Sequence, residues 1–145
     1  MTQEEKDLLL KDICSRLPYG VKVQIDLQSN IYPPMICKVC NIEFAEMGGS
    51  FIGVEVLPDS YCEYREFLCK PYLFPMSSMT TEQKKEYTHI VNYISSDDTD
   101  NWKEGEFIYT EQLDQLMHFY HKNHIDYRGL IEKGLAIDAT NINIY

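Results

Sequence analysis

The hydrophobic pattern of this chain changes its period near residue 20, and that change constrains the fold more than any other feature. Residues 2–17 repeat apolar side chains every three or four positions, as an amphipathic helix does. From residue 21 the period becomes two, as in a strand with one buried face. Pro18 and Gly20 separate the two patterns, because proline stops a helix and glycine permits a turn. The pattern predicts an α+β chain that begins with one helix.

The start of this helix carries its own signal. Thr2 and Glu5 have the spacing of a capping box, in which the hydroxyl and the carboxylate each accept a hydrogen bond from the other residue's backbone N–H. The apolar stripe that follows contains Leu9, Leu10, Ile13, Cys14 and Leu17. We therefore expect helix over residues 1–18, with this stripe facing the core.

Residues 19–79 are expected to form a β-rich core. The strand candidates are residues 21–27, 35–44, 51–57 and 61–68, and turn-forming residues separate them. No helical pattern lies between these strands, so parallel crossovers are not expected and neighbouring strands should be antiparallel. The spacing favours a small antiparallel meander or an SH3-like curled barrel. Pro71 and Pro75 enclose a segment that we expect to be rigid and extended.

The last part of the chain, residues 80–137, has helical patterns. One helix is expected to begin after a cap at Thr80 or Thr81. The polar residues 95–106 predict a loop, and residues 107–109 a short strand. A further helix is expected to be capped by Thr110 and to end at Asn123. A short helix over 127–133 should follow, capped by Asp126 and ended by Gly134. Residues 138–145 are expected to be a loosely held tail. All 145 residues are expected to form a single domain.

Charge narrows the classes of partner. Thirteen Lys and Arg stand against 23 Asp and Glu, which gives a net charge of −10. Such a surface repels nucleic-acid phosphates and anionic membranes, so direct contact with either is not expected. The N-terminus lacks the features of a signal peptide, and no segment is apolar enough to span a membrane. The chain is therefore expected to be cytoplasmic, with its five cysteines as reduced thiols.

Motifs that would carry metal or catalytic chemistry are incomplete. Cys37 and Cys40 form one CxxC pair, whereas a zinc ribbon needs two such pairs. The acidic segment 97–106 has Trp102 where a calcium loop starting at Asp97 would have glycine. Three histidines recur at positions 118, 121 and 124, without the spacing of a metal-binding helix. We therefore predict no cofactor, no metal and no catalytic constellation.

Three stretches resemble a known family. They are LLLKDICSRLPYGVK at 8–22, KPYLFPMSSMT at 70–80 and HIDYRGLIEKGLA at 124–136, about a quarter of the chain. The combination resembles a family of small uncharacterised proteins of Bacteroides-group gut bacteria, often encoded in mobile or prophage-like regions. The resemblance implies an N-terminal helix, a variable β-rich middle and C-terminal helices. The chain departs from the family at Phe74, where arginine is common, and in its C-terminal tail.

The polar and amphipathic residues of these stretches define a candidate interaction surface. They are Arg16, Tyr19, Tyr72, Ser77, Ser78, Asp126, Tyr127 and Arg128. Tyrosine gives contact area with a polar tip, which suits a protein interface. The other interpretation is structural: the same residues hold the sheet to the helices, with Arg128 paired to a carboxylate such as Asp126.

The leading functional hypothesis is a non-enzymatic interaction module that binds another protein and belongs to an accessory or mobile element. One alternative is a small enzyme or ligand-binding domain between the β core and the C-terminal helices, which would use His118, His121 or His124. A second alternative is an acidic inhibitor or nucleic-acid mimic. The segment 97–106 holds five acids and one lysine, so the charge is concentrated in one place and a uniform mimic surface is disfavoured.

Overall fold

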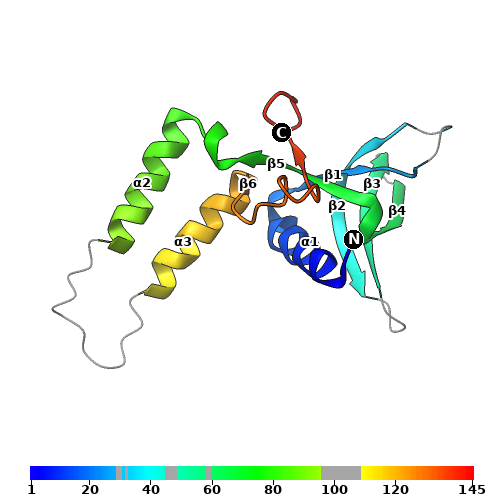
Figure 1. The fold of residues 1–145 in the computed structure, drawn as a ribbon, viewed down its shortest axis with the longest axis horizontal. Helices are drawn as coiled ribbons and strands as arrows, with labels where there is room; N and C mark the ends of the chain where they lie inside the picture. Colours follow the sequence, from blue (N-terminus) through cyan, green and yellow to red (C-terminus); the bar gives the residue numbers. More distant parts are fainter. Residues whose placement is uncertain (29–30, 32, 45–48, 58–59, 96–108) are drawn as a thin grey trace.

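The computed structural model describes residues 1–28, 31, 33–44, 49–57, 60–95 and 109–145 (Figure 1). Residues 96–106 of the expected loop over 95–106, and residues 107 and 108 of the expected short strand, lie outside these residues, whereas Ser95 is helical. Helix α1 covers Gln3–Arg16 and begins with the predicted capping box. Glu5 N donates to Thr2 Oγ1 at 3.2 Å, and Thr2 N donates to Glu5 Oε2 at 2.7 Å. One 3₁₀ turn, η1 (Leu17–Tyr19), follows, and Gly20 then takes a left-handed conformation with φ of 69°.

In the described part of the chain, seven strands form one sheet. The strands are β1 (Lys22–Ile25), β2 (Met35–Phe44), β3 (Ser50–Leu57), β4 (Ser60–Arg65), β5 (Cys69–Pro75), β6 (Ile125–Asp126) and β7 (Ile137–Asp138). Their order is β4-β3-β2-β1-β5-β6, and β7 also pairs with β5. Strands β1 to β4 follow one another in the chain and pair antiparallel, which confirms the meander, and β5 pairs antiparallel with the other edge of β1. The turn η2 (Glu66–Leu68) replaces the end of the expected fourth strand.

The sheet is open, so the alternative prediction of an SH3-like curled barrel is wrong. A barrel would need β4 to pair with the strand at the other end of the sheet. Instead the C-terminal part of the chain occupies the second edge of β5, where β6 pairs from Phe74 and β7 from Tyr72, both in parallel. The extended segment expected between Pro71 and Pro75 is thereby an inner strand, and Pro71 lies opposite Val23 of β1.

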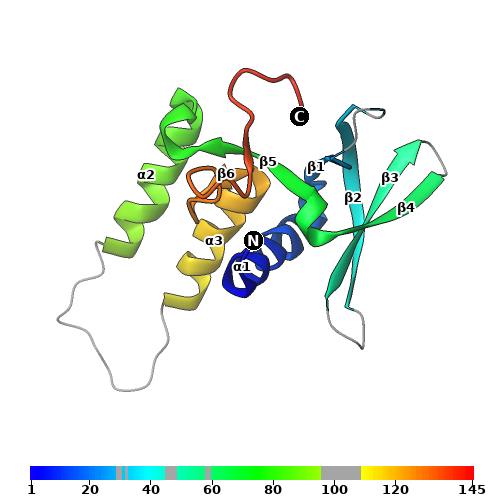
Figure 2. The ribbon, with the colours of Figure 1, turned by 45° about the vertical axis from the view of Figure 1, so that its right-hand side comes forward.

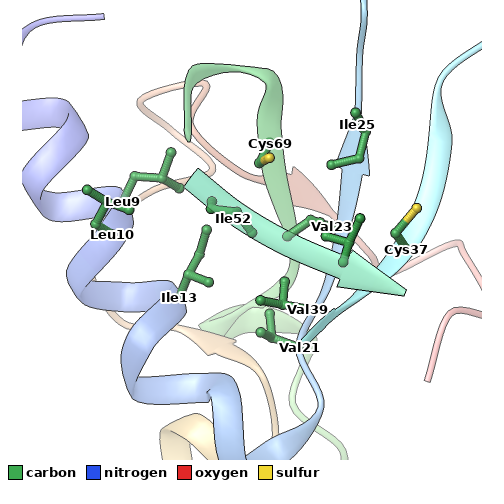
Figure 3. Close-up of a cluster of buried hydrophobic side chains, with 11 residues drawn as sticks. Leu9, Leu10, Ile13, Val21, Val23, Ile25, Cys37, Val39, Ile52 and Cys69 are labelled. Atoms are coloured by element: carbon green, nitrogen blue, oxygen red, sulfur yellow. The ribbon is translucent and has the colours of Figure 1, made fainter. Parts of the chain in front are cut away.

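The main core lies between α1 and one face of the sheet (Figure 3). Its buried members are Leu9, Leu10, Ile13, Val21, Val23, Ile25, Cys37, Val39, Ile52, Val54 and Cys69. The period of two in β1 thus buries Val23 and Ile25 and leaves Lys22 and Gln24 half-buried on the opposite face. Burying each large aliphatic side chain contributes about 1.5–3 kcal/mol, so this cluster fixes how α1 lies on the sheet.

Two further helices pack against each other beside this core (Figures 1 and 2). A short 3₁₀ turn, η3 (Met76–Ser78), leads to α2 (Thr81–Ser95). Thr80 caps α2 as predicted, since its Oγ1 accepts from Gln83 N at 3.2 Å. Helix α3 covers Tyr109–Lys122 and ends before Asn123 as expected. It begins one residue before Thr110, so Thr110 is not its cap and Tyr109 is not in a strand. None of the helices in the described part of the chain has the length and apolarity for crossing a membrane.

The C-terminal segment differs most from expectation. Residues 127–134 form bends and turns instead of a short helix. Asp126 belongs to β6, and its carboxylate accepts from Leu130 N and Ile131 N at 2.9 and 2.8 Å, so it closes a turn. Gly134 has the expected left-handed conformation, with φ of 69°.

The expected loosely held tail is packed onto the sheet. Ala139 and Ile144 are buried, and Ala139 N donates to Leu73 O at 2.8 Å. Burial of these apolar side chains offsets the entropy lost in ordering a chain end.

Candidate functional site

A buried ion pair lies within α1, and its arginine also connects α1 to the end of α3. Arg16 is fully buried, and its guanidinium donates from Nε to Asp12 Oδ2 at 2.7 Å and from Nη2 to Asp12 Oδ1 at 3.0 Å. Its remaining hydrogen bonds go to backbone carbonyls, from Nη1 to Tyr120 O at 3.1 Å and from Nη2 to Ile125 O at 2.8 Å. The arginine thereby holds α1, α3 and β6 together. Asp12 lies four residues before Arg16, a spacing of helical ion pairs that sequence reasoning overlooked.

Arg128 approaches the same carboxylate from the C-terminal segment. Its buried Nε lies 3.2 Å from Asp12 Oδ1, without the angle of a hydrogen bond. The partner is therefore Asp12 rather than the Asp126 suggested by the structural interpretation. The guanidinium lies over the ring of Tyr127, with Cζ 4.6 Å from the ring centre. One carboxylate thus faces two guanidinium groups, and the cluster carries one surplus positive charge.

Tyr127 connects this cluster to the histidines of α3. Its ring stacks on Tyr120 at 4.7 Å, and its hydroxyl is 2.9 Å from His121 Nε2, a hydrogen bond. Burial raises the pKa of Tyr127. Burial and the positive charge of Arg16 lower the pKa of His121. Both side chains are therefore neutral near pH 7, and each satisfies the other.

A second tyrosine–histidine pair lies at the surface. Tyr19 Oη is 2.9 Å from His118 Nδ1, and the two rings meet edge to face at 5.4 Å. Tyr19 also contacts the ring of His121 at 6.2 Å. We call Tyr19, His118, Tyr127 and Arg128 the junction surface, because η1, α3 and the segment after β6 meet there.

His124 does not join the other two histidines. It has a left-handed backbone with φ of 51°, is buried, and stacks on Tyr145 with ring centres 3.8 Å apart. Its Nδ1 is buried without a hydrogen-bond partner in the described part of the chain. Burial, with a further contribution from Arg16, lowers the pKa of His124 to about 4. The three histidines therefore split between two locations.

The remaining candidate residues lie apart from the junction surface. Tyr72 is buried in β5, and its hydroxyl donates to Gln24 Oε1 at 3.0 Å. Ser78 closes the loop before α2 by donating from Oγ to Pro75 O at 2.8 Å, and Ser77 is exposed. Of the eight predicted surface residues, Arg16, Tyr72 and Asp126 are buried. Their contacts agree with the structural interpretation, whereas Tyr19, Tyr127 and Arg128 have accessible parts.

The cysteines lie in separate environments. Cys37 is buried and Cys40 is exposed. Cys69 is buried in the core, and burial raises the pKa of its thiol to about 12, so the reactive thiolate is disfavoured at neutral pH. Among the described residues, no three His, Cys, Asp or Glu side chains are placed to hold a metal ion.

A cavity of about 410 Å³ lies between the first turns of α1 and the β2–β3 end of the sheet. Lys6 and Glu66 form an ion pair at 3.3 Å in its wall, and Arg65 lies beside them. A shallower hollow of about 460 Å³ runs along α2 and is lined by Lys84, Lys85 and His89 among others. His118, His121 and His124 line neither of these cavities.

The chain matches no protein family, no curated protein and no solved structure. Its function is therefore inferred from the geometry of the described residues.

Proposed function

We propose that the protein is a non-enzymatic interaction module and that it binds a partner protein at the junction surface. The observation that carries this proposal is the position of Arg128. Its guanidinium lies between the Asp12 carboxylate and the Tyr127 ring, and 17% of the side chain is accessible. Its polar interactions among the described residues are with Asp12 and with the Tyr127 side chain, which also forms a hydrogen bond to it.

An arginine side chain held in this way is preorganised for binding a partner. Its planar group is already ordered by stacking, so binding loses less side-chain entropy than it would with a free arginine. Arginine and tyrosine are also enriched among the residues that dominate interface energies. The surplus positive charge of the cluster suits a carboxylate or a backbone carbonyl of the partner.

The two tyrosine–histidine pairs support binding more than catalysis. A general base needs a free nitrogen within reach of a substrate proton, and His121 Nε2 and His118 Nδ1 are each engaged by a tyrosine hydroxyl, that of Tyr127 and that of Tyr19. These pairs instead give the surface a fixed shape, with hydroxyl and ring edges available at its rim.

Replacing Arg128 with Met is expected to lower recovery of the partner from native lysate by roughly tenfold or more, as loss of a dominant interface residue does. Capture by the tagged full chain, quantified by mass spectrometry, measures this. Lys133→Met is the matched control, because Lys133 is exposed on the turn after Arg128 and should leave recovery unchanged. Equal recovery by both variants, with circular dichroism showing both folded, would remove the junction surface as the binding site.

A ligand-binding domain is the second candidate, and the 410 Å³ cavity favours it. This volume falls within the range of small-molecule sites. The cavity lies against the start of α1, whereas the sequence-based alternative placed a site between the β core and the C-terminal helices. Stabilisation of the chain by a small molecule in a thermal-shift screen, lost in Arg65→Met but kept in Arg128→Met, would support it.

A further inference from the structure

Strand β4 ends the sheet and leaves one of its own edges open. It pairs with β3 on one side, and no strand of the described chain pairs with its other side. An open edge presents unpaired backbone N–H and C=O groups that can take another strand. Proteins commonly block such edges with proline or lysine, and the β4 sequence SYCEYR contains neither.

The core ends at β4. In β3, Ile52 and Val54 are fully buried. Their neighbours across the strand pair are Tyr64 and Cys62, which face the same side and are only half-buried. A further strand beside β4 would cover Tyr64 and Cys62 and extend the apolar layer, which gives strand addition a hydrophobic component.

On the opposite face of the sheet, a group of hydrogen-bond acceptors extends from β4 across β3 to β2, and Glu63 is its carboxylate on the edge strand. The Tyr61 hydroxyl lies 2.9 Å from both Asn41 Oδ1 and Glu63 Oε1, so one proton serves two acceptors. Gly53 lies beneath them, and a Cβ there would come within 2.0 Å of Asn41 Oδ1 and 2.4 Å of the Tyr61 hydroxyl. Glu43 is also exposed next to Asn41, whose Nδ2 is 3.5 Å from Glu43 Oε1.

The nearby guanidinium of Arg65 contacts an aromatic ring and forms no ion pair with these carboxylates. The Arg65 guanidinium lies over the Phe51 ring, with Cζ 5.0 Å from its centre. The carboxylates of Glu43 and Glu63 have no ion pair with any described residue. The whole chain carries a net charge of −10, which attracts cationic partners at long range.

We propose that the open edge of β4 binds an extended, basic segment of a partner protein, which adds a strand to the sheet. Backbone hydrogen bonds to β4 hold the segment. Its alternate side chains are Lys or Arg toward Glu63 of β4, and apolar toward Tyr64 and Cys62. This surface is separate from the junction surface, so the two proposals stand or fall independently.

Hydrogen exchange on the full chain tests the proposal with three blocked peptides. Each has valine at alternate positions, and the positions between them are all Lys, all Gln or all Glu. The Lys peptide is expected to protect the β4 amides and to bind Glu63→Gln roughly 2- to 5-fold more weakly than the wild type, because one exposed charge pair contributes modestly. Glu132→Gln, whose side chain is exposed elsewhere, is the matched control and should bind as the wild type does.

Three results would overturn the proposal. Equal protection by the Gln or Glu peptide would show that the edge accepts strands without regard to charge. Protection of β4 that depends on protein concentration alone, with a dimer in sedimentation, would identify a second copy as the occupant. No protection by any peptide would exclude strand addition. Capture of a partner through Arg128 is unaffected by each of these results.

Discussion

Arg16→Met is expected to lower the free energy of unfolding by about 3–5 kcal/mol, as removal of one member of a buried ion pair does. The variant leaves the Asp12 carboxylate fully buried with Arg128 as its remaining cationic partner. It also removes the donors to Tyr120 O and Ile125 O. Urea unfolding followed by circular dichroism measures the change. The urea concentration at the midpoint should fall. The slope of the unfolding free energy against urea concentration should stay constant, because the folded core is otherwise the same.

Two comparisons separate this effect from a general loss of helix. Lys11→Met replaces an exposed cation on the same helix and should change stability by no more than about 0.5 kcal/mol. The double variant Asp12→Leu/Arg16→Met removes both partners of the ion pair. Its loss of unfolding free energy should therefore be smaller than the sum of the losses in Asp12→Leu and Arg16→Met. A loss of unfolding free energy below about 1 kcal/mol for Arg16→Met would contradict the assignment of Arg16 as the link between α1 and α3.

Stability is expected to fall as the pH drops from 6.5 toward 4, and His124 should account for about 3 kcal/mol of the loss. Burial lowers the pKa of His124 to about 4 in the folded chain, from an ordinary value of 6.5. Above pH 6.5 the imidazole is neutral in both states. Between 6.5 and 4 the unfolded chain binds a proton that the folded chain does not, so acid favours unfolding. Arg16 and Lys22, the charges that act on this ring, are both positive and strengthen the effect.

His124→Asn isolates this contribution, because asparagine tolerates the left-handed backbone at this position. The variant loses the stacking on Tyr145 and should be less stable at pH 7, but its stability should fall less steeply between pH 6.5 and 4. Urea unfolding at several pH values measures both slopes, and an NMR titration of the wild-type imidazole gives its pKa directly. Identical slopes would contradict the burial of a neutral His124.

Elements with strong local signals were predictable from the sequence. The Thr2–Glu5 capping box defines the start of α1, and the alternation of β1 buries Val23 and Ile25. Thr80 caps α2 as its sequence indicates. The turn signals between the strands also predict the antiparallel meander. These features depend on residues a few positions apart, so local rules are sufficient.

The candidate site was only partly predictable. The Asp12–Arg16 pair has a recognisable helical spacing. The contact between Arg128 and Asp12 and the hydrogen bond between Tyr127 and His121 arise only because the segment after β6 returns to α1 and α3. Asp126 shows how a local signal can mislead. Its sequence context is that of a helix cap, but it lies in β6, which pairs with β5, and its carboxylate accepts hydrogen bonds from a turn instead.

By itself, the sequence determined the N-terminal helix, the four strands of the meander, which face of α1 and of β1 is apolar, and the net charge of −10. The tertiary structure decided that the sheet stays open at β4, that Arg16 is buried rather than displayed, and that the tail packs through Ile144 and Tyr145. The physical reason is that hydrophobic periodicity and capping act within a few residues. Strand order, ion-pair partners and burial of the tail depend on contacts between residues far apart in the chain, whose energies no local pattern contains.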